Sequence, residues 1–324
     1  MEGLGRQIAR SMEEFAEMTN DGATRREVSL TNGDARARIA LRGAELRRWL
    51  TAGREMIWTP DPAFWADAAP ILFPVVGWTR DGQTRVGGKT YPLGLHGFAR
   101  HCDFVVEEQE KERVVLRLDD TEETHAQYPF AFAFRVEYAL EPDRLTIRLH
   151  VENKGVAPLP YACGLHPGLR WPFDGGAPAD YSIVFDEAEN PDVPVIAPGG
   201  LFSAETRPAP MRGRALPLSS EVFSREALCF LEARSRGLTF AREGGAALRV
   251  ELEDFPHIAL WSRPGAPFLC IEPWTGCGDP VGFAGELADK PSMRLLAPGR
   301  RARHAARFSL VEDGFDALGE AGET

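Results

Sequence analysis

A long series of short strand-like segments constrains the fold of this chain more than any other feature. After Gly22, segments with alternating apolar and polar residues follow one another, and Gly, Pro, Asn and Asp fill the breaks between them. This alternation is typical of β-strands that bury one face and expose the other. The segments are EVSLTN, ARARIAL, DFVVEE, RVVLRLDD, AFAFRVEYAL, RLTIRLHVEN, YSIVFDEA, GLTFAR, ALRVELED, HIALWSR, PFLCIEP and RHAARFSLVE.

The segment RVVLRLDD illustrates the pattern. Val114, Leu116 and Leu118 share one face of such a strand, whereas Arg113 and Arg117 lie on the other. A sheet with one dry and one wet face has this pattern. Helical periodicity of comparable strength does not occur between the segments, which argues against βαβ units and a parallel sheet. We therefore predict an all-β fold, a large antiparallel β-sandwich.

The chain is expected to contain one domain with two extensions. Residues 1–22 predict a short amphipathic helix, which either lies on its own domain or forms a dimer contact, so the protein is expected to be a monomer or a homodimer. Residues 23–313 are predicted to form a single β-sandwich domain, with Pro- and Gly-rich loops at 60–70 and 190–220. Residues 314–324 are small and polar and are expected to fray. The apolar stripe of the helix consists of Leu4, Ile8, Met12, Phe15 and Met18.

Composition and charge exclude several classes of protein. Hydrophobic residues make up 44% and charged residues 26% of the chain, which is typical of soluble globular domains. The formal charge of −11 argues against nonspecific binding to nucleic acid or to anionic membranes. No segment approaches the roughly 20 apolar residues of a membrane span. The five cysteines are scattered and form no C-x-x-C pair, which favours a reducing cytoplasm.

Three segments contain more Gly, Pro and aromatic residues than structure alone requires. Each places one titratable residue, His96, His166 or Glu272, in surroundings typical of rigid loops and sugar-sized clefts. Carbohydrate recognition combines flat aromatic faces with fixed polar groups for the hydroxyls. The segments are PILFPVVGWTRDGQTRVGGKTYPLGLHGFAR (70–100), YACGLHPGLRWPF (161–173) and PFLCIEPWTGCGDP (267–280).

The order of these motifs resembles the aldose 1-epimerase family. HGFAR at 96–100, GLHP at 164–167 and IEPWTG at 271–276 are jointly specific, and DP.FW, APILFP and YPF.F occur in the same order. HGFAR in particular is similar to the bacterial branch of mutarotase-like proteins. The resemblance extends from about Leu41 to Phe308. It implies a single-domain, galactose mutarotase-like β-supersandwich with a sugar cleft on one concave sheet.

The resemblance also implies roles for the three titratable residues. His166 matches the general acid, Glu272 the general base, and His96 the second histidine, which binds the sugar and assists at the ring oxygen. Exchange of α and β anomers requires removal of the C1 hydroxyl proton and protonation of the ring oxygen, so that the ring opens. A carboxylate and an imidazole can perform both transfers without a metal or an organic cofactor. This mechanism requires an ionised Glu272 and a protonated His166, which we expect in the resting state.

The sequence departs from the family where sugar contacts are expected. Relatives usually carry Arg after FP.VG, but here Trp78 occupies that place and Arg80 follows two residues later, on the same face of a strand. Arg80 is therefore a candidate sugar contact, and Trp78 and Trp274 are candidate aromatic platforms, although each is also compatible with a core position. Arg100 and Arg170 lie close to the histidine motifs and suit a sugar phosphate, because Arg pairs bidentately with phosphate oxygens.

Several alternatives remain open from the sequence. Two histidines and a glutamate also suit a metal site, although their spacing contains no ligand pair typical of one. A hexose-6-phosphate mutarotase and a non-catalytic sugar-binding protein are the other readings. His257 is a further candidate for lining the cleft. The remaining histidines, which lack motif support, are assigned structural roles: His101, His125, His150 and His304.

Overall fold

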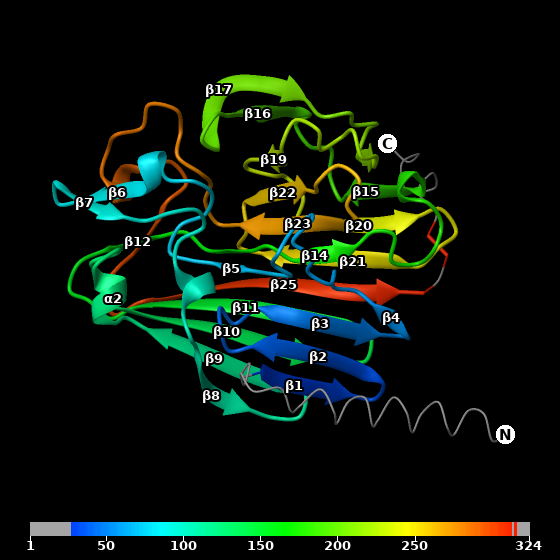
Figure 1. Cartoon of the computed structure of the whole chain (residues 1–324), viewed down its shortest axis with the longest axis horizontal. Helices are drawn as coiled ribbons and strands as arrows, with labels where there is room; N and C mark the ends of the chain where they lie inside the picture. Colours follow the sequence, from blue (N-terminus) through cyan, green and yellow to red (C-terminus); the bar gives the residue numbers. More distant parts are fainter. Residues whose placement is uncertain (1–26, 313, 316–324) are drawn as a thin grey trace.

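The computed structural model describes residues 27–312, 314 and 315, which form two layers of antiparallel β-sheet (Figure 1). The predicted N-terminal helix and most of the predicted tail lie outside the described residues. Phe315 forms backbone hydrogen bonds with Gly244 and Gly245. The predicted antiparallel all-β architecture is confirmed, and segments separated by hairpin-length breaks pair as neighbours because antiparallel strands need only short connections.

One layer is a nine-stranded sheet that runs along the molecule. All of its strand pairs are antiparallel. Its strands in spatial order are β18 (Ala215–Pro217), β15 (Tyr181–Phe185), β20 (Gly237–Arg242), β21 (Ala247–Glu253), β25 (Arg301–Val311), β11 (Arg144–Asn153), β10 (Phe132–Leu140), β9 (Arg113–Asp119) and β8 (Val105–Gln109).

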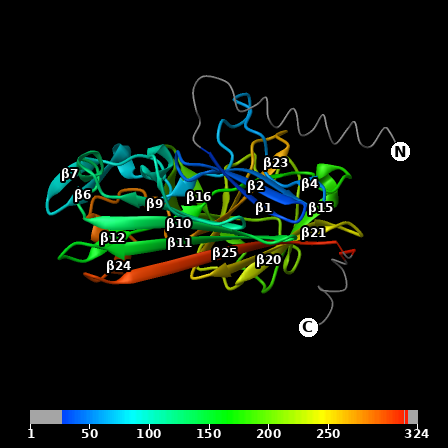
Figure 2. The ribbon, with the colours of Figure 1, turned by 90° about the horizontal axis from the view of Figure 1, so that it is seen from below.

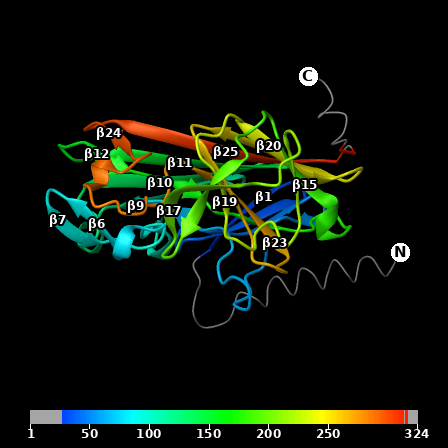
Figure 3. The same cartoon turned by 90° about the horizontal axis from the view of Figure 1, so that it is seen from above.

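The other layer contains two smaller sheets, which face the nine-stranded sheet in the edge-on views (Figures 2 and 3). A four-stranded sheet has the order β1 (Glu27–Asn32), β2 (Ala35–Ala40), β3 (Leu46–Thr51) and β4 (Arg54–Glu55). A six-stranded sheet has the order β19 (Leu228–Phe230), β22 (His257–Trp261), β23 (Phe268–Trp274), β13 (Gly164–Leu165) and β5 (Ile71–Leu72), with β14 (Gly168–Arg170) also paired to β23.

The remaining elements are short strands and helical turns. Three separate two-stranded sheets join β6 (Gln83–Val86) to β7 (Lys89–Pro92), β12 (Leu159–Tyr161) to β24 (Arg294–Leu296), and β16 (Asp192–Ala197) to β17 (Leu201–Pro208). Within residues 27–312, the helical elements are α2 (Glu122–His125) and the single-turn 3-10 helices η1 (Arg80–Gly82), η2 (Ala99–His101), η3 (Pro178–Asp180) and η4 (Leu287–Asp289).

The core lies between the layers and follows the alternation seen in the sequence. In β9, Val114, Leu116 and Leu118 are buried, as predicted. On the other face Arg113 pairs with Glu137 at 2.8 Å, so the outer surface of the sheet carries cross-strand ion pairs. One continuous hydrophobic cluster includes residues from Val28 to Leu310. The strand pattern therefore determines which face of each long strand enters the core.

The prediction of an irregular loop over residues 190–220 is wrong in part. This stretch contains the β16–β17 hairpin and strand β18, which pairs with β15. Pro and Gly interrupt the alternation of apolar and polar residues in the hairpin, so the sequence did not indicate its strands. Gly199 and Gly200, with φ angles of 84° and 75°, form its turn, because positive φ is readily accessible to glycine. The loop at 60–70, by contrast, contains no strand of the sheets.

Candidate active site

Glu272 lies in the middle of β23, a strand whose seven residues are all buried. The almost continuous apolar run FLCI is typical of a central strand covered on both faces. The pairs Gly164↔Trp274 and Gly168↔Cys270 place His166 opposite Glu272, in the short gap between β13 and β14. Two segments about 100 residues apart in sequence thus bring an imidazole and a carboxylate together on one face of the sheet.

His96 reaches the same place from the turn that follows β7. Its backbone has a φ of 61°, and Gly97 beside it has a φ of 69°. A Cβ on Gly97 would stand only 2.4 Å from the carbonyl oxygen of Phe73, so this close approach requires glycine. The Gly77 N–H donates to Nδ1 of His96 at 3.1 Å. Neutral His96 therefore carries its proton on Nε2.

The structure brings together the three residues to which the sequence assigned catalysis. Nε2 of His166 lies 3.3 Å from Oε2 of Glu272. The rings of His96 and His166 meet edge to face, with centroids 5.4 Å apart. The exposed fractions of His96, His166 and Glu272 are 7%, 8% and 2%, so all three groups are almost fully removed from water.

Burial shifts the pKa values of Glu272, His166 and His96. It raises the pKa of Glu272 well above the usual range, partly offset by the Trp274 side chain. Burial, reinforced by the charge of Arg100, lowers the pKa of His166 to about 3. The pKa of His96 is also well below its usual range, chiefly because of burial. These shifts favour a protonated Glu272 and neutral imidazoles, the opposite of the ionised Glu272 and protonated His166 expected from the sequence, because a buried charge is expensive.

Two polar atoms in this group lack a hydrogen-bond partner among the described residues. They are Oε2 of Glu272 and Nδ1 of His166. The 3.3 Å contact between Glu272 and His166 is not aligned as a hydrogen bond. Most buried polar groups in native proteins are satisfied, and unpaired ones concentrate at functional sites. Oε2 of Glu272 and Nδ1 of His166 thus retain hydrogen-bonding capacity that the described residues do not use.

The three residues line a cavity of about 650 Å³, here called the catalytic cavity. This volume lies in the usual range for small-molecule sites. Trp65 stacks on His166 with centroids 5.0 Å apart, and Trp261 meets the same imidazole edge to face at 5.7 Å. Trp274 also lines the cavity. The walls therefore combine aromatic surfaces with polar groups, the combination expected of a sugar site.

The tip of the β16–β17 hairpin closes one side of the catalytic cavity. Residues 196–200 line it together with Trp78, whose side chain is 43% exposed. The Trp78 indole fills the space where a side chain on Gly200 would stand, with 1.8 Å between the positions. Sequence reasoning missed this wall and assigned no role to Trp65 or Trp261. Trp65 nevertheless belongs to DP.FW, a motif quoted for the resemblance, and Trp261 lies in the strand-like segment HIALWSR.

Of the two arginines predicted near the histidine motifs, Arg100 lines the catalytic cavity and Arg170 does not. Arg100 lines the catalytic cavity, where it forms an ion pair with Asp67. Arg170 is exposed and donates to Thr59 and to the Ile57 carbonyl oxygen. His257 does not line this cavity; its side chain is buried, and its Nδ1 accepts the Glu232 N–H at 3.0 Å.

The structure corrects the assignment of Arg80 as a sugar contact. Its guanidinium donates to the Phe283 carbonyl oxygen at 3.0 Å and to Asp81 at 3.2 Å. It lines a different cavity of about 170 Å³. The sequence argument assumed a strand here, where residues two apart share a face, but Arg80 begins the 3-10 turn η1 and Asp81 has a φ of 57°. The turn directs Arg80 away from the face of Trp78.

We therefore expect Arg80→Ala to leave sugar affinity unchanged within about twofold. A lost hydrogen bond from a charged donor to the sugar would weaken binding by about 1.5–3 kcal/mol. Isothermal titration of a free hexose against wild type and variant measures this difference. A loss of tenfold or more would show that Arg80 reaches the ligand in solution.

Three side chains of the catalytic cavity region offer a set of metal ligands. One ligand atom each of His166, Cys270 and Glu272 lies within 4.8 Å of the others. Nitrogen, sulfur and oxygen ligands of this kind suit zinc. Cys270 had not been considered from the sequence, because it is one of five free cysteines without a ligand-like spacing. Its thiol pKa is raised by burial, which opposes the thiolate that a metal requires.

Solved structures define the class of protein to which this fold and site belong. The galactose mutarotase related enzyme of Lactobacillus acidophilus is 29% identical, with a TM-score of 0.82, and the match covers 90% of this chain and 99% of that chain. A galactose mutarotase-like protein of Lactobacillus casei is 28% identical with a TM-score of 0.82, covering 88% of this chain and all of that chain (100%). The predicted galactose mutarotase-like β-sandwich is confirmed.

Sequence comparison assigns the family. The family model described as aldose 1-epimerase matches residues 26–195. The protein LacX of Lactococcus lactis is 32% identical over 257 residues, which are 76% of this chain and 86% of that protein. This chain belongs to the aldose 1-epimerase family, a family of isomerases, as the sequence motifs predicted. The described part of the chain contains no helix with the length and hydropathy that a membrane crossing requires.

Proposed function

We propose that this protein is a mutarotase that interconverts the α and β anomers of a free hexose in the catalytic cavity. The observation that carries the proposal is the pair of proton-transfer groups, His166 and Glu272, 3.3 Å apart in a buried cavity. The anomeric hydroxyl oxygen and the ring oxygen are both bonded to C1. Groups that exchange protons with these two oxygens must therefore stand side by side, as Glu272 and His166 do.

The reaction requires one transferable proton, which Glu272 and His166 share. The direction of the pKa shifts favours Glu272 as the carrier of this proton, and its transfer to His166 gives the carboxylate and imidazolium that the reaction needs. Hydroxyl groups of a bound sugar favour this transfer, because hydrogen bonds to a carboxylate stabilise its charged form. No proton need enter from solvent, which suits side chains that are almost fully removed from water.

The chemical steps then follow from the positions of these groups. Glu272 accepts the C1 hydroxyl proton while His166 donates its proton to the ring oxygen. The bond between C1 and the ring oxygen breaks, and C1 becomes a carbonyl carbon. After rotation about the bond from C1 to C2, the former ring oxygen attacks the other face of C1. The two protons return, so the opposite anomer forms and the pair regains its starting state.

His96 has a different role in this proposal. Its Nδ1 accepts the Gly77 N–H, so the neutral ring presents its Nε2–H as a donor. A fixed neutral donor can bind a sugar oxygen without competing for the proton shared by Glu272 and His166. We assign His96 to sugar binding and to assistance at the ring oxygen.

A free hexose is favoured over a hexose 6-phosphate. The charged residues lining the catalytic cavity, besides Glu272, are Arg100, Arg263, Asp67 and Glu226, whose formal charges cancel. Arg100 is already paired with Asp67. Arg263 has no ion pair with a described residue and lies over the Trp261 ring at 5.9 Å, so it alone of these arginines is left to meet an anion, whereas a phosphate dianion requires several cationic or N–H donors. The aromatic walls formed by Trp65, Trp261 and Trp274 instead suit the C–H faces of a neutral sugar.

Nuclear magnetic resonance exchange spectroscopy at anomeric equilibrium tests the proposal directly. The protein is expected to accelerate exchange between the anomeric signals of at least one free aldose. A panel should contain glucose, galactose and their 6-phosphates. Binding without acceleration for every sugar would favour the sugar-binding reading, and acceleration of the phosphates alone would favour the phosphosugar reading.

The same assay separates acid–base catalysis from metal catalysis. We expect full activity after treatment with a chelator, because Glu272 and His166 suffice for both proton transfers. Elemental analysis of the protein before and after treatment gives the control. Activity that disappears with the metal and returns with one specific divalent ion would instead support the cluster of His166, Cys270 and Glu272 as a metal centre.

A further inference from the structure

A buried thiol, that of Cys270, lies beside the acid–base pair of the catalytic cavity. Cys270 precedes Glu272 by two residues in β23, so the two side chains point to the same face of the strand. His166 stands opposite Glu272 on the neighbouring segment. One ligand atom from each of the three residues lies within 4.8 Å of the other two. Strand register thus brings a nitrogen, a sulfur and an oxygen ligand to one point of the sheet.

The spacing of His166 and Glu272 matches that of two ligands on one zinc ion. Nε2 of His166 lies 3.3 Å from Oε2 of Glu272. Two tetrahedral ligands that each lie about 2.0–2.1 Å from zinc stand about 3.3–3.4 Å apart. Oε2 of Glu272 has no hydrogen-bond partner among the described residues, although only 2% of this side chain is exposed. A cation bound between the two residues would give this buried oxygen a partner.

The charges and the sulfur atom of this set suit zinc better than a hard cation. A thiolate and a carboxylate compensate both charges of a divalent ion, so the buried complex with a neutral imidazole has no net charge. Zn²⁺ binds sulfur, nitrogen and oxygen ligands, whereas Mg²⁺ and Ca²⁺ prefer oxygen. Burial raises the pKa of both Cys270 and Glu272, so zinc must displace a proton from each. We therefore expect reversible binding, weaker than that of a structural zinc.

We propose that His166, Cys270 and Glu272 form an inhibitory zinc site, at which the ion displaces the catalytic proton and stops anomer exchange. This inference rests on the proposed function, because the ion inhibits only if His166 and Glu272 are the groups that transfer protons. Binding forms one bond from zinc to each ligand and releases two protons to solvent, one from the thiol and one from the carboxyl. The imidazole and the carboxylate are then both occupied, so neither proton transfer can occur.

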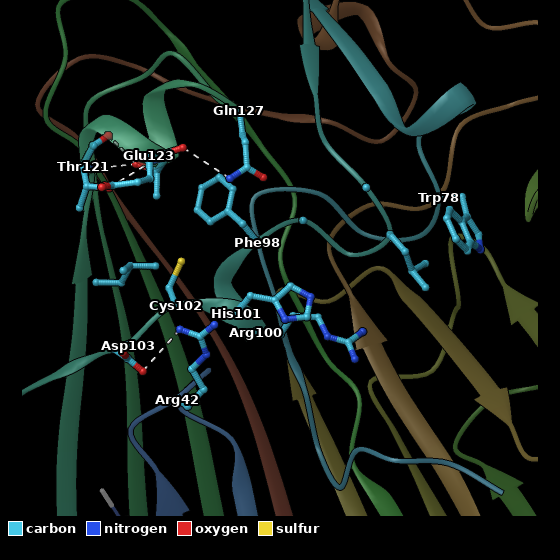
Figure 4. A pocket seen from close by; sticks show the side chains of 15 residues that line it. Arg42, Trp78, Phe98, Arg100, His101, Cys102, Asp103, Thr121, Glu123 and Gln127 are labelled. Carbon is cyan, nitrogen blue, oxygen red and sulfur yellow. Dashed lines mark hydrogen bonds and ion pairs between the residues drawn. The ribbon is translucent and has the colours of Figure 1, made fainter. Parts of the chain in front are cut away.

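The cavity that adjoins the catalytic cavity also contains residue types that bind zinc, but these do not converge. Its volume is about 780 Å³, and His101, Cys102 and Asp103 are among the residues that line it (Figure 4). Asp103 points toward Arg42, 3.6 Å away. Within the described part of the chain this cavity offers no set of three ligand atoms close to one another. Cys102 is partly exposed, whereas the other four cysteines are buried, so it provides the control thiol.

Inhibition is tested on chelator-treated protein with an aldose whose anomeric exchange it accelerates. Zinc chloride should inhibit exchange, excess chelator should restore it, and magnesium chloride at the same concentration should have no effect. Relative to its own zinc-free rate, Cys270→Ala should require at least about tenfold more zinc for half-inhibition. Even groups that only orient a metal ligand contribute about 10- to 100-fold to metal affinity. Cys102→Ala should retain the wild-type sensitivity to zinc.

Two binding measurements do not depend on activity. Competition with a chromophoric chelator gives the zinc affinity, which should fall by the same factor in Cys270→Ala and stay unchanged in Cys102→Ala. Cobalt chloride should give a thiolate-to-cobalt charge-transfer absorption in wild type and Cys102→Ala but not in Cys270→Ala. Circular dichroism melts verify folding, and Cys270→Ser, which keeps the size of the side chain, repeats each test.

These readouts separate failure of this inference from failure of the proposed function. Absence of exchange for every aldose would contradict the proposed function, and the zinc affinities and cobalt spectra would still judge the site. Unchanged zinc affinity in the Cys270 variants, or a wild-type cobalt spectrum without the thiolate absorption, would overturn the inference. Acceleration of exchange by zinc would overturn it as well, because the ion would then be a cofactor and not an inhibitor.

Discussion

Glu272→Gln is expected to reduce anomer exchange by about 10²- to 10⁴-fold while sugar affinity stays within a few-fold of wild type. Loss of a positioned general base has an effect of this size. Glutamine has nearly the same shape and preserves the hydrogen-bonding capacity of the buried position, so the cavity should persist. The measurement is exchange spectroscopy combined with titration of the same sugar. More than half of the wild-type exchange rate in the variant would contradict the assignment of Glu272 as the base.

The stability of this variant provides the control against misfolding. The pKa of Glu272 is raised in the folded protein above its ordinary value of 4.5. Above pH 4.5 the unfolded carboxyl therefore loses its proton before the folded one, and wild-type stability falls as the pH rises. Glutamine lacks this effect. Glu272→Gln should consequently melt at or above the wild-type temperature at pH 8, and a lower melting temperature would indicate structural damage.

His166→Gln is expected to reduce exchange by a similar factor, about 10²- to 10⁴-fold, because it removes the acid that protonates the ring oxygen. The double variant with Glu272→Gln should lose little more than either single variant. Residues that act as a unit show such non-additivity. Exchange rates of the four proteins in the mutant cycle give the measurement. Strictly multiplicative losses would show that the two residues act independently.

The folding control for His166→Gln uses the opposite pH range. Burial lowers the pKa of His166 to about 3 from its ordinary value of 6.5. Between these pH values the unfolded histidine binds more protons, so wild-type stability rises with increasing pH. The variant should show a smaller decline in melting temperature between pH 6.5 and pH 4. An unchanged decline would mean that His166 is not buried as described.

Much of the fold was predictable because one physical signal, burial of alternate residues, recurs in every long strand. RVVLRLDD and RLTIRLHVEN became β9 and β11, neighbours of β10 in the nine-stranded sheet. The hairpin β16–β17 was missed because Pro194 and a Gly-Gly turn obscure its alternation. Strands as short as β13 and β14 contain too few residues to show a period.

The candidate site was predictable to the extent that motifs mark it. His96, His166 and Glu272 were found because Gly, Pro and aromatic residues surround each of them. Arg80 was misplaced because a strand was assumed, although the Asp81-Gly82 dipeptide in TRDG is typical of a turn and has positive φ at both residues. The resting charges expected from the motifs run against the directions in which burial shifts the pKa values of Glu272 and His166, because motifs do not report burial.

The all-β class, the faces that enter the core and the residues able to transfer protons follow from local periodicity and from side-chain chemistry. The position of His166 opposite Glu272 and the contact between Trp78 and Gly200 arise from tertiary structure. Each of these relations joins segments far apart in the chain. Strand register and sheet packing set them, and neither is a property of any single segment.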